Sequence, residues 1–197
     1  MKRLTLTVAM LALGATVCSP KANAASLVNE IPVKAESTFQ LAKINTNSTV
    51  LATSEWKQFS SAEGKFSIMM PDVQIVDKTE DKPEFLLKMY VATNEQSAFI
   101  AGYEEFHVDV SQLSDRTFLD AFVEAFLGGD KKLVSQQEIS LGEFTGREIE
   151  YQEQGYTAKI RLYRVGQRLY ILGAINPQAG DTEKFFDSFT LEAFSGN

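Results

Sequence analysis

Apolar residues alternate with polar ones along several short stretches of the chain. The first of these stretches places apolar side chains at every second position, at Phe66, Ile68 and Met70. This spacing predicts a strand with one apolar face, and Pro71 is expected to end it. The same kind of pattern predicts strands over residues 85–93 and 98–110, separated by a polar turn. The folded part is therefore expected to begin near Trp56.

The apolar spacing changes to that of a helix after Ser114, whose hydroxyl suits an N-cap. Apolar residues then recur along one side of a helix, at Phe118, Leu119, Phe122, Val123 and Phe126. Gly128 and Gly129 are expected to end it, because glycine readily adopts the left-handed conformation that closes many helices. A closing helix is predicted over residues 181–189, with Asp181 or Thr182 as its cap. It is expected to cover the apolar face of the sheet with Phe185, Phe186 and Phe189.

The C-terminal third carries the clearest strand pattern. Strands are predicted over residues 133–141, 144–153, 156–165 and 168–174. A two-residue turn at Gln154-Gly155 would place Glu150 opposite Lys159 and Glu148 opposite Arg161. That register gathers opposite charges on one face and leaves on the other Ile149, Tyr151, Ile160, Leu162, Leu169 and Ile171. Antiparallel strands with segregated helices predict an α+β fold, with an antiparallel sheet of about six to seven strands flanked by two or more helices.

Residues 1–24 have the organisation of a secretory signal peptide. Lys2 and Arg3 precede an apolar run over residues 4–17, and Ala22-Asn23-Ala24 offers a small-residue cleavage pattern. We expect cleavage after Ala24 and export from the cytoplasm. The alternative is a lipoprotein cleavage ahead of Cys18, which would leave an acylated cysteine at the membrane.

Residues 25–54 are rich in Ala, Ser, Thr and Asn and show only weak periodicity. This composition predicts a flexible tether. The scattered apolar residues in it leave open the alternative of an arm that docks to a partner. A single α+β domain is expected over residues 55–194.

Composition and charge narrow the classes of function. The formal net charge of -7 argues against a nucleic-acid partner, because phosphate contacts need clustered Lys and Arg. No apolar run of the mature chain is long enough for a membrane-spanning helix. The single cysteine, Cys18, would leave with the signal peptide, so the mature chain could form no thiolate metal site or redox pair. No metal and no cofactor is expected.

Two groups of residues could carry catalysis. His107 is the only histidine and shares a predicted strand face with Asp109, but no motif places a serine nucleophile beside it. Glu148 and Glu150 point the same way along one strand, as the paired carboxylates of a hydrolase do. Both are expected to be ionised, because they face basic residues, whereas a general acid needs a raised pKa. A carboxylate-based hydrolase is therefore the less favoured alternative, and the chain is expected not to be an enzyme.

The charged face of the predicted meander is the candidate binding surface. It gathers Arg161, Tyr163, Arg168 and Tyr170, and Arg and Tyr are enriched at protein interfaces. We expect a protein partner to bind there, with Glu148 and Glu150 holding the arginines in place. The alternative is a carrier of a small hydrophobic ligand, with a cavity beneath the helix that contains residues 118–126.

Four stretches carry a family resemblance. They are Trp56-Lys-Gln-Phe-Ser-Ser-Ala-Glu-Gly-Lys-Phe-Ser-Ile-Met-Met-Pro71, Phe144-Thr-Gly-Arg-Glu-Ile-Glu150, Arg161-Leu-Tyr-Arg-Val-Gly-Gln-Arg-Leu-Tyr170 and Phe185-Phe-Asp-Ser-Phe189. The chain resembles the PsbP and Mog1 fold family over residues 56–191, in particular small exported cyanobacterial domains. The resemblance implies a curved antiparallel sheet flanked by helices, and a non-catalytic assembly factor or binding module. The partner it implies is a membrane complex such as a photosystem, and no functional residue of the family is transferred.

Overall fold

The computed structural model describes residues 9–10, 37–38, 55–94, 96–129 and 131–192. The chain divides into two units, Met1–Thr53 and Ser54–Asn197. In the first unit, β1 (Ala9–Met10) pairs antiparallel with β2 (Ser37–Thr38). The expected signal peptide and its cleavage site, and the expected tether, lie outside the described residues apart from these two short strands, and they stay predictions.

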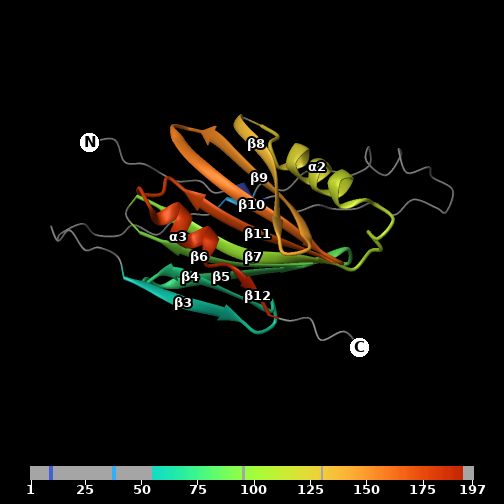
Figure 1. The fold of residues 1–197 in the computed structure, drawn as a ribbon, viewed down its shortest axis with the longest axis horizontal. Coiled ribbons are helices and arrows are strands. Elements are labelled where there is room, and N and C mark those ends of the chain that lie inside the picture. The colour runs from blue at the N-terminus through green and yellow to red at the C-terminus, as the bar shows by residue number, and fades with distance from the viewer. Residues whose placement is uncertain (1–8, 11–36, 39–54, 95, 130, 193–197) are drawn as a thin grey trace. The chain divides into compact units, whose positions relative to one another are not determined.

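The second unit is built on a seven-stranded sheet in the order β5-β6-β7-β11-β10-β9-β8 (Figure 1). Its strands are β5 (Ile75–Asp81), β6 (Phe85–Thr93), β7 (Ala98–Phe106), β8 (Lys132–Leu141), β9 (Phe144–Glu153), β10 (Tyr156–Val165) and β11 (Arg168–Ile175). A three-stranded sheet in the order β12-β4-β3 consists of β3 (Trp56–Ser61), β4 (Phe66–Pro71) and β12 (Thr190–Leu191). Every strand pair is antiparallel. The described helices are α2 (Asp115–Phe126) and α3 (Asp181–Asp187), so the expected α+β class is confirmed.

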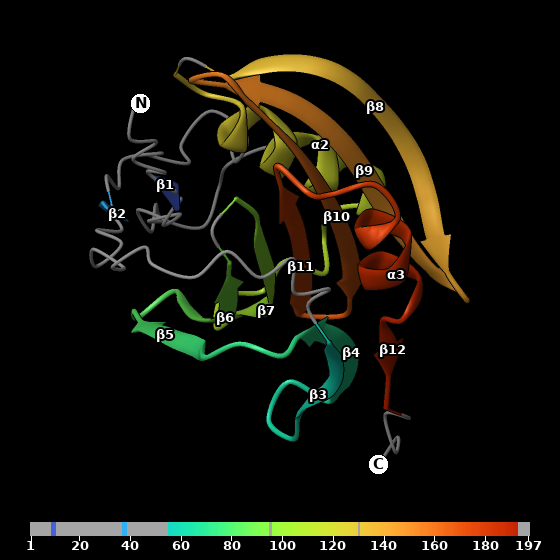
Figure 2. The same cartoon turned by 90° about the vertical axis from the view of Figure 1, so that its left-hand side faces the viewer.

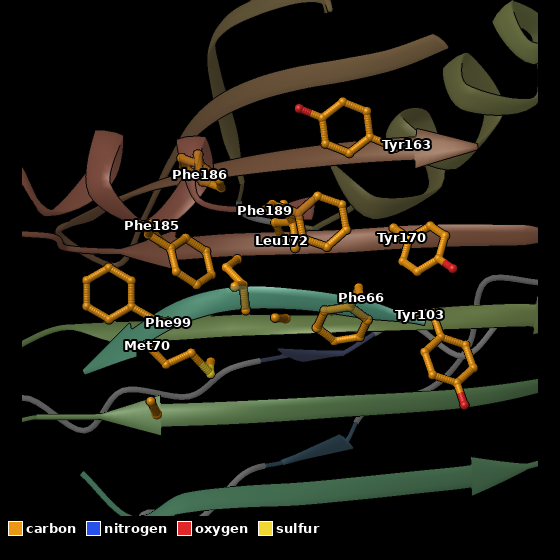
Figure 3. Packing of buried hydrophobic residues seen from close by; sticks show 14 residues of the cluster. Phe66, Met70, Phe99, Tyr103, Tyr163, Tyr170, Leu172, Phe185, Phe186 and Phe189 are labelled. Atoms are coloured by element: carbon orange, nitrogen blue, oxygen red, sulfur yellow. The ribbon is translucent and has the colours of Figure 1, made fainter. Parts of the chain in front are cut away.

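An aromatic cluster joins β4 and α3 to one face of the seven-stranded sheet (Figure 3). It contains Phe66, Phe99, Tyr103, Tyr163, Tyr170, Phe185, Phe186 and Phe189, all of them buried. The Tyr163 and Phe189 rings stack at 6.0 Å and 7°. We call this side of the sheet the α3 face. The opposite side, which carries Ile149, Leu162 and Leu169, is the α2 face.

Helix α2 follows its sequence pattern closely. The Ser114 hydroxyl accepts a hydrogen bond from the Thr117 backbone N–H at 3.2 Å, which confirms the expected N-cap. The helix ends at Phe126, two residues before the glycine pair, and Gly129 adopts φ 83°. Its buried residues are Phe118, Leu119, Phe122 and Val123. They pack against the α2 face, where Phe126 also meets Tyr151 edge to face at 5.3 Å.

The closing helix differs from its prediction in two ways. It ends at Asp187, and its N-cap is Gly180 at φ 87°, with no capping hydrogen bond from a side chain. It also covers the α3 face, although we expected its phenylalanines on the aliphatic side. The physical reason is the position of β4, because the Met69 backbone N–H donates to the Ser188 hydroxyl at 2.8 Å and holds the end of α3 against β4.

The predicted strand over residues 98–110 is too long, since β7 ends at Phe106. Beyond it, backbone carbonyls bond to side chains and not to a neighbouring strand. Val110 and Leu113 accept from the Arg164 guanidinium at 2.6 and 2.7 Å, and Val108 accepts from Gln167 at 3.1 Å. Strands β3, β5 and β12 were not predicted. The strands over 85–93, 144–153 and 156–165 are confirmed with their expected bounds. The strand that begins at Phe66 and the strands over 133–141 and 168–174 are confirmed to within one residue.

Candidate functional site

The register of β9 and β10 is the predicted one. Glu150 lies opposite Lys159, Glu148 opposite Arg161, and Ile149 opposite Ile160. The structure therefore places Glu148, Arg161, Tyr163, Arg168 and Tyr170 on the α3 face, as the alternation requires.

Arg161 is the centre of an ion-pair network on that face. Its Nε donates to Glu148 Oε2 at 2.6 Å, and its Nη1 donates to Asp187 Oδ1 at 3.3 Å. The guanidinium carbon lies 4.8 Å from the centre of the Phe186 ring. The side chain is 24% exposed, so Arg161 presents part of a fixed, planar cation to solvent.

Glu148 has the donors that a buried carboxylate needs. Burial alone would raise its pKa, but hydrogen bonds from Arg161 and Gln137 outweigh that effect and the pKa lies below its usual value. The Gln137 amide donates to Oε1 at 2.9 Å, and Lys159 Nζ lies 3.6 Å from the same oxygen. Lys159 thus pairs with Glu148, although Glu150 is the residue opposite it in the register. Glu148 is expected to be ionised at neutral pH.

The two tyrosines of the predicted binding strip do not lie on the surface. Tyr163 is 4% exposed and Tyr170 is fully buried. The Tyr170 hydroxyl donates to the Gly64 carbonyl at 2.8 Å, so it anchors the turn between β3 and β4. Both rings belong to the aromatic cluster, because β4 and α3 cover the part of the face where they lie. A partner could therefore contact only the more exposed members of the strip.

Arg168 connects three parts of the second unit. Its Nε donates to Glu105 Oε2 at 2.8 Å, and its Nη1 donates to the Glu63 carbonyl at 2.9 Å. The guanidinium carbon lies 4.8 Å from the centre of the Tyr103 ring. Arg168 therefore joins β11 to β7 and to the turn before β4, and its first role is structural.

His107 and Asp109 lie in the segment after β7 and not on a strand. Both are exposed, and Asp109 accepts a hydrogen bond from the Ser111 backbone N–H at 2.8 Å. Among the described residues, the side-chain partners of Glu148 are Arg161, Gln137 and Lys159, and His107 is not one of them. The three candidate catalytic residues therefore do not form one site.

Three buried charged groups were missed by the sequence patterns, namely Arg147, Arg164 and Glu104. Arg164 is 5% exposed and holds the segment before α2, with its guanidinium carbon 4.7 Å from the centre of the Phe118 ring. Its Nε donates to the nearby Gly166 carbonyl at 3.4 Å, but the carbonyls of Val110 and Leu113 are more than 50 residues away in the chain, so no local sequence pattern indicates this role. Glu104 is 1% exposed on the α2 face, opposite Leu87 and Leu169. Burial, and secondarily the charge of Glu80, raise the pKa of Glu104 to about 8.

Other site classes find little support in the part of the chain that the structure describes. Among those residues, no group of three His, Cys, Asp or Glu side chains could hold a metal ion. None of the described helices has the length and apolar character needed to cross a membrane. A groove of about 510 Å³ does lie between α2 and β8.

Comparison with known proteins finds likeness in structure but not in sequence. No protein-family model matches the chain, and no curated protein matches it. The chain is similar in fold to cyanobacterial PsbP. The solution structure of PsbP (CyanoP) from Synechocystis sp. PCC 6803 is 13% identical, with a TM-score of 0.48, covering 75% of this chain and 98% of that chain. Protein PA94 of Pseudomonas aeruginosa, whose function is unknown, is 14% identical with a TM-score of 0.34, covering 63% of this chain and 84% of its own.

Proposed function

We propose that this chain is an exported, non-catalytic protein-binding domain of the periplasm or thylakoid lumen. Its binding surface is the exposed rim of the α3 face, with Arg161 at the centre and Glu148 and Glu150 beside it. The partner that the sequence resemblance implies is a membrane complex such as a photosystem. Export depends on the signal pattern of residues 1–24.

The arrangement of Arg161 is the observation that supports protein binding. Its guanidinium is held by Glu148 and Asp187 and lies against the Phe186 ring, yet the side chain remains 24% exposed. An arginine that is already ordered loses little side-chain entropy when a partner binds. Arginine is also one of the residue types most often found at the energetic centre of protein interfaces.

A carboxylate-based hydrolase is supported less well. Such an enzyme needs a general acid with a raised pKa near its substrate, and the pKa of Glu148 is lowered. Glu104 has the raised pKa, but it is buried and faces Leu87 and Leu169. Neither carboxyl group therefore has both a raised pKa and a position that a substrate could reach.

A carrier of a hydrophobic ligand is also supported less well. The apolar side of α2 is packed against the sheet, with Leu119 fully buried and Phe118 and Phe122 each 7% exposed. The groove beside the helix is lined largely by charged and amide side chains, such as Arg116 and Gln136. An apolar ligand favours a cavity with mostly apolar walls.

The test compares Arg161→Gln with a matched loss of charge elsewhere, Lys57→Gln. Lys57 is an exposed cation whose partner is Asp72, outside the α3 face. Each full-length variant is produced in the cells that make the protein, and native gels of envelope extracts are probed with an antibody. We expect the wild type to migrate with a large complex. Arg161→Gln should reduce the bound fraction by about tenfold or more, and Lys57→Gln by less than about twofold.

Two results would contradict the proposal. Migration of the wild type as a free single chain would argue against a stable partner. If Arg161→Gln binds the complex as well as the wild type does, the assignment of the binding surface to Arg161 is wrong, although the protein still has a partner. Urea unfolding of the purified variants separates loss of binding from loss of folding.

A further inference from the structure

Strand β8 forms one edge of the seven-stranded sheet (Figure 2). Among the described strands it pairs only with β9, so its second edge carries backbone N–H and C=O groups without a strand partner. Residues 132–138 are all exposed. The pairing with β9 shifts between Leu133 and Ser135, and residues 135–141 form a regular ladder beyond that bulge. An exposed regular edge of this kind is suited to adding one more strand.

Two exposed apolar side chains lie at the start of the same strand. Leu133 is 43% exposed and Val134 is 50% exposed. Within the described part of the chain, the third large hydrophobic residue with comparable exposure is Val76 of β5. The start of β8 therefore offers apolar surface beside an open ladder.

The groove of about 510 Å³ lies along the same strand. It is lined by Gln136, Gln137 and Glu138 of β8, by Arg147 of β9, and by one side of α2 that includes Arg116 and Glu124. Arg147 is 5% exposed and pairs with both Asp120 of α2 and Glu138 of β8, which fixes the helix beside the strand. Asp120 and Glu138 are themselves 47% and 59% exposed, but each is paired with Arg147. Arg116 and Glu124 are the exposed charges at the two ends of the helical side of the groove.

The direction of α2 relative to β8 determines which end of the strand Arg116 and Glu124 each lie near. Asp120 and Glu138 meet at Arg147, whereas Phe126 meets Tyr151, which lies opposite Leu133. The helix therefore runs opposite to β8, with Arg116 toward the end of the strand and Glu124 toward its start. Their eight-residue separation spans about 12 Å along a helix. Four residues of an extended chain span about 13 Å and return a side chain to the same face.

We propose that the edge of β8 binds an extended segment of a partner protein, which adds as an antiparallel strand. The segment carries an acidic residue beside Arg116 and, four residues later, a basic residue beside Glu124. Backbone hydrogen bonds supply the pairing, and the two charges set direction and register. This surface is separate from the Arg161 surface, so the inference goes beyond the proposed function and can fail without affecting it.

The probes are two peptides of equal composition, Thr-Thr-Asp-Val-Thr-Val-Lys-Thr-Thr and Thr-Thr-Lys-Val-Thr-Val-Asp-Thr-Thr, both with blocked ends. Binding to the full chain is measured by amide shifts in NMR titrations, and amide hydrogen exchange locates the contact. We expect the first peptide to bind roughly tenfold more tightly, because two attractive charge pairs replace two repulsive ones. Its binding should slow exchange within residues 135–141. The same peptide with N-methyl groups at its two valines should bind much more weakly, since donors are removed.

The double variant Arg116→Glu/Glu124→Arg supplies the matched test on the protein. Both side chains are exposed and the net charge is unchanged, so the fold should be preserved. We expect it to prefer the second peptide by a similar factor. Equal affinity of the wild type for both peptides, or no protection of residues 135–141, would overturn the proposal. Protection of those amides that rises with protein concentration in the absence of peptide would also overturn it, in favour of a second copy of the chain.

Discussion

The two faces of the seven-stranded sheet each bury a glutamate and surround it differently. On the α3 face, Glu148 accepts hydrogen bonds from Arg161 and Gln137. On the α2 face, Glu104 lies between Leu87 and Leu169, and its Oε1 has no hydrogen-bond partner. The pKa of Glu148 is lowered, and that of Glu104 is raised to about 8. Burial raises a carboxyl pKa in both cases, and the supply of donors decides the outcome.

The largest effect is expected for Glu104→Gln, which keeps the shape of the protonated side chain and removes its titration. The folded-state pKa of about 8 lies above the ordinary value of 4.5, so the charged form opposes folding. The contribution of Glu104 to wild-type stability should therefore fall by up to about 1.4 kcal/mol per pH unit between those values. The variant should exceed the wild type by roughly 4 kcal/mol at pH 8 and match it near pH 4. Urea unfolding at pH 4, 6 and 8 measures the difference, and parallel curves for the two proteins would refute the neutral state of Glu104.

Glu148→Gln should have the opposite sign and a smaller size. It leaves the part-buried Arg161 without its best acceptor, at a cost of about 1 to 3 kcal/mol near pH 7. The folded-state pKa is lowered, so this stabilisation is present above the ordinary value of 4.5 and is lost as the pH falls through the folded-state pKa. The two unfolding curves should thus converge toward acid pH. If the variant is as stable as the wild type at pH 7, the contrast between the faces is wrong.

Asp187→Asn should have the smallest effect. Asp187 also accepts from Arg161, but its side chain is 68% exposed. Solvent screens such a pair, so the loss should be below about 0.5 kcal/mol. Thermal unfolding of this variant beside Glu148→Gln tests whether burial, and not mere pairing with Arg161, makes Glu148 important. If the two variants lose the same amount of stability, the burial of Glu148 does not explain its importance.

The β9 to β11 meander was predictable because two local signals agree. The Gln154-Gly155 turn fixes the register, and the same register sorts charged from aliphatic residues. Which elements cover each face was not predictable, because β4 lies far from the meander in sequence and holds the end of α3 on its own side of the sheet. Tyr163 and Tyr170 therefore looked like surface residues, although they pack in the aromatic cluster.

The charged residues also differ in how far the sequence predicts their partners. Glu148 and Arg161 are paired by strand register, which sequence can predict. Arg164 donates to the carbonyls of Val110 and Leu113, which only the tertiary fold brings near it, so the sequence does not predict these hydrogen bonds. Glu104 did leave a signal, because it occupies a strand position whose alternating neighbours include Ile100 and Phe106.

The pairing of β12 with β4 has a consequence for the order of folding. Thr190 lies opposite Ser67, and Leu191 opposite Phe66, so the small sheet joins the beginning of the second unit to its last described residues. Contacts this distant in sequence close large loops and form slowly. A chain made from its N-terminus keeps Phe66 without its Phe189 contact until residue 189 has emerged, more than 120 residues after Phe66. The aromatic cluster is thus completed last, and a shortened chain that ends before α3 would leave it open to water and prone to association.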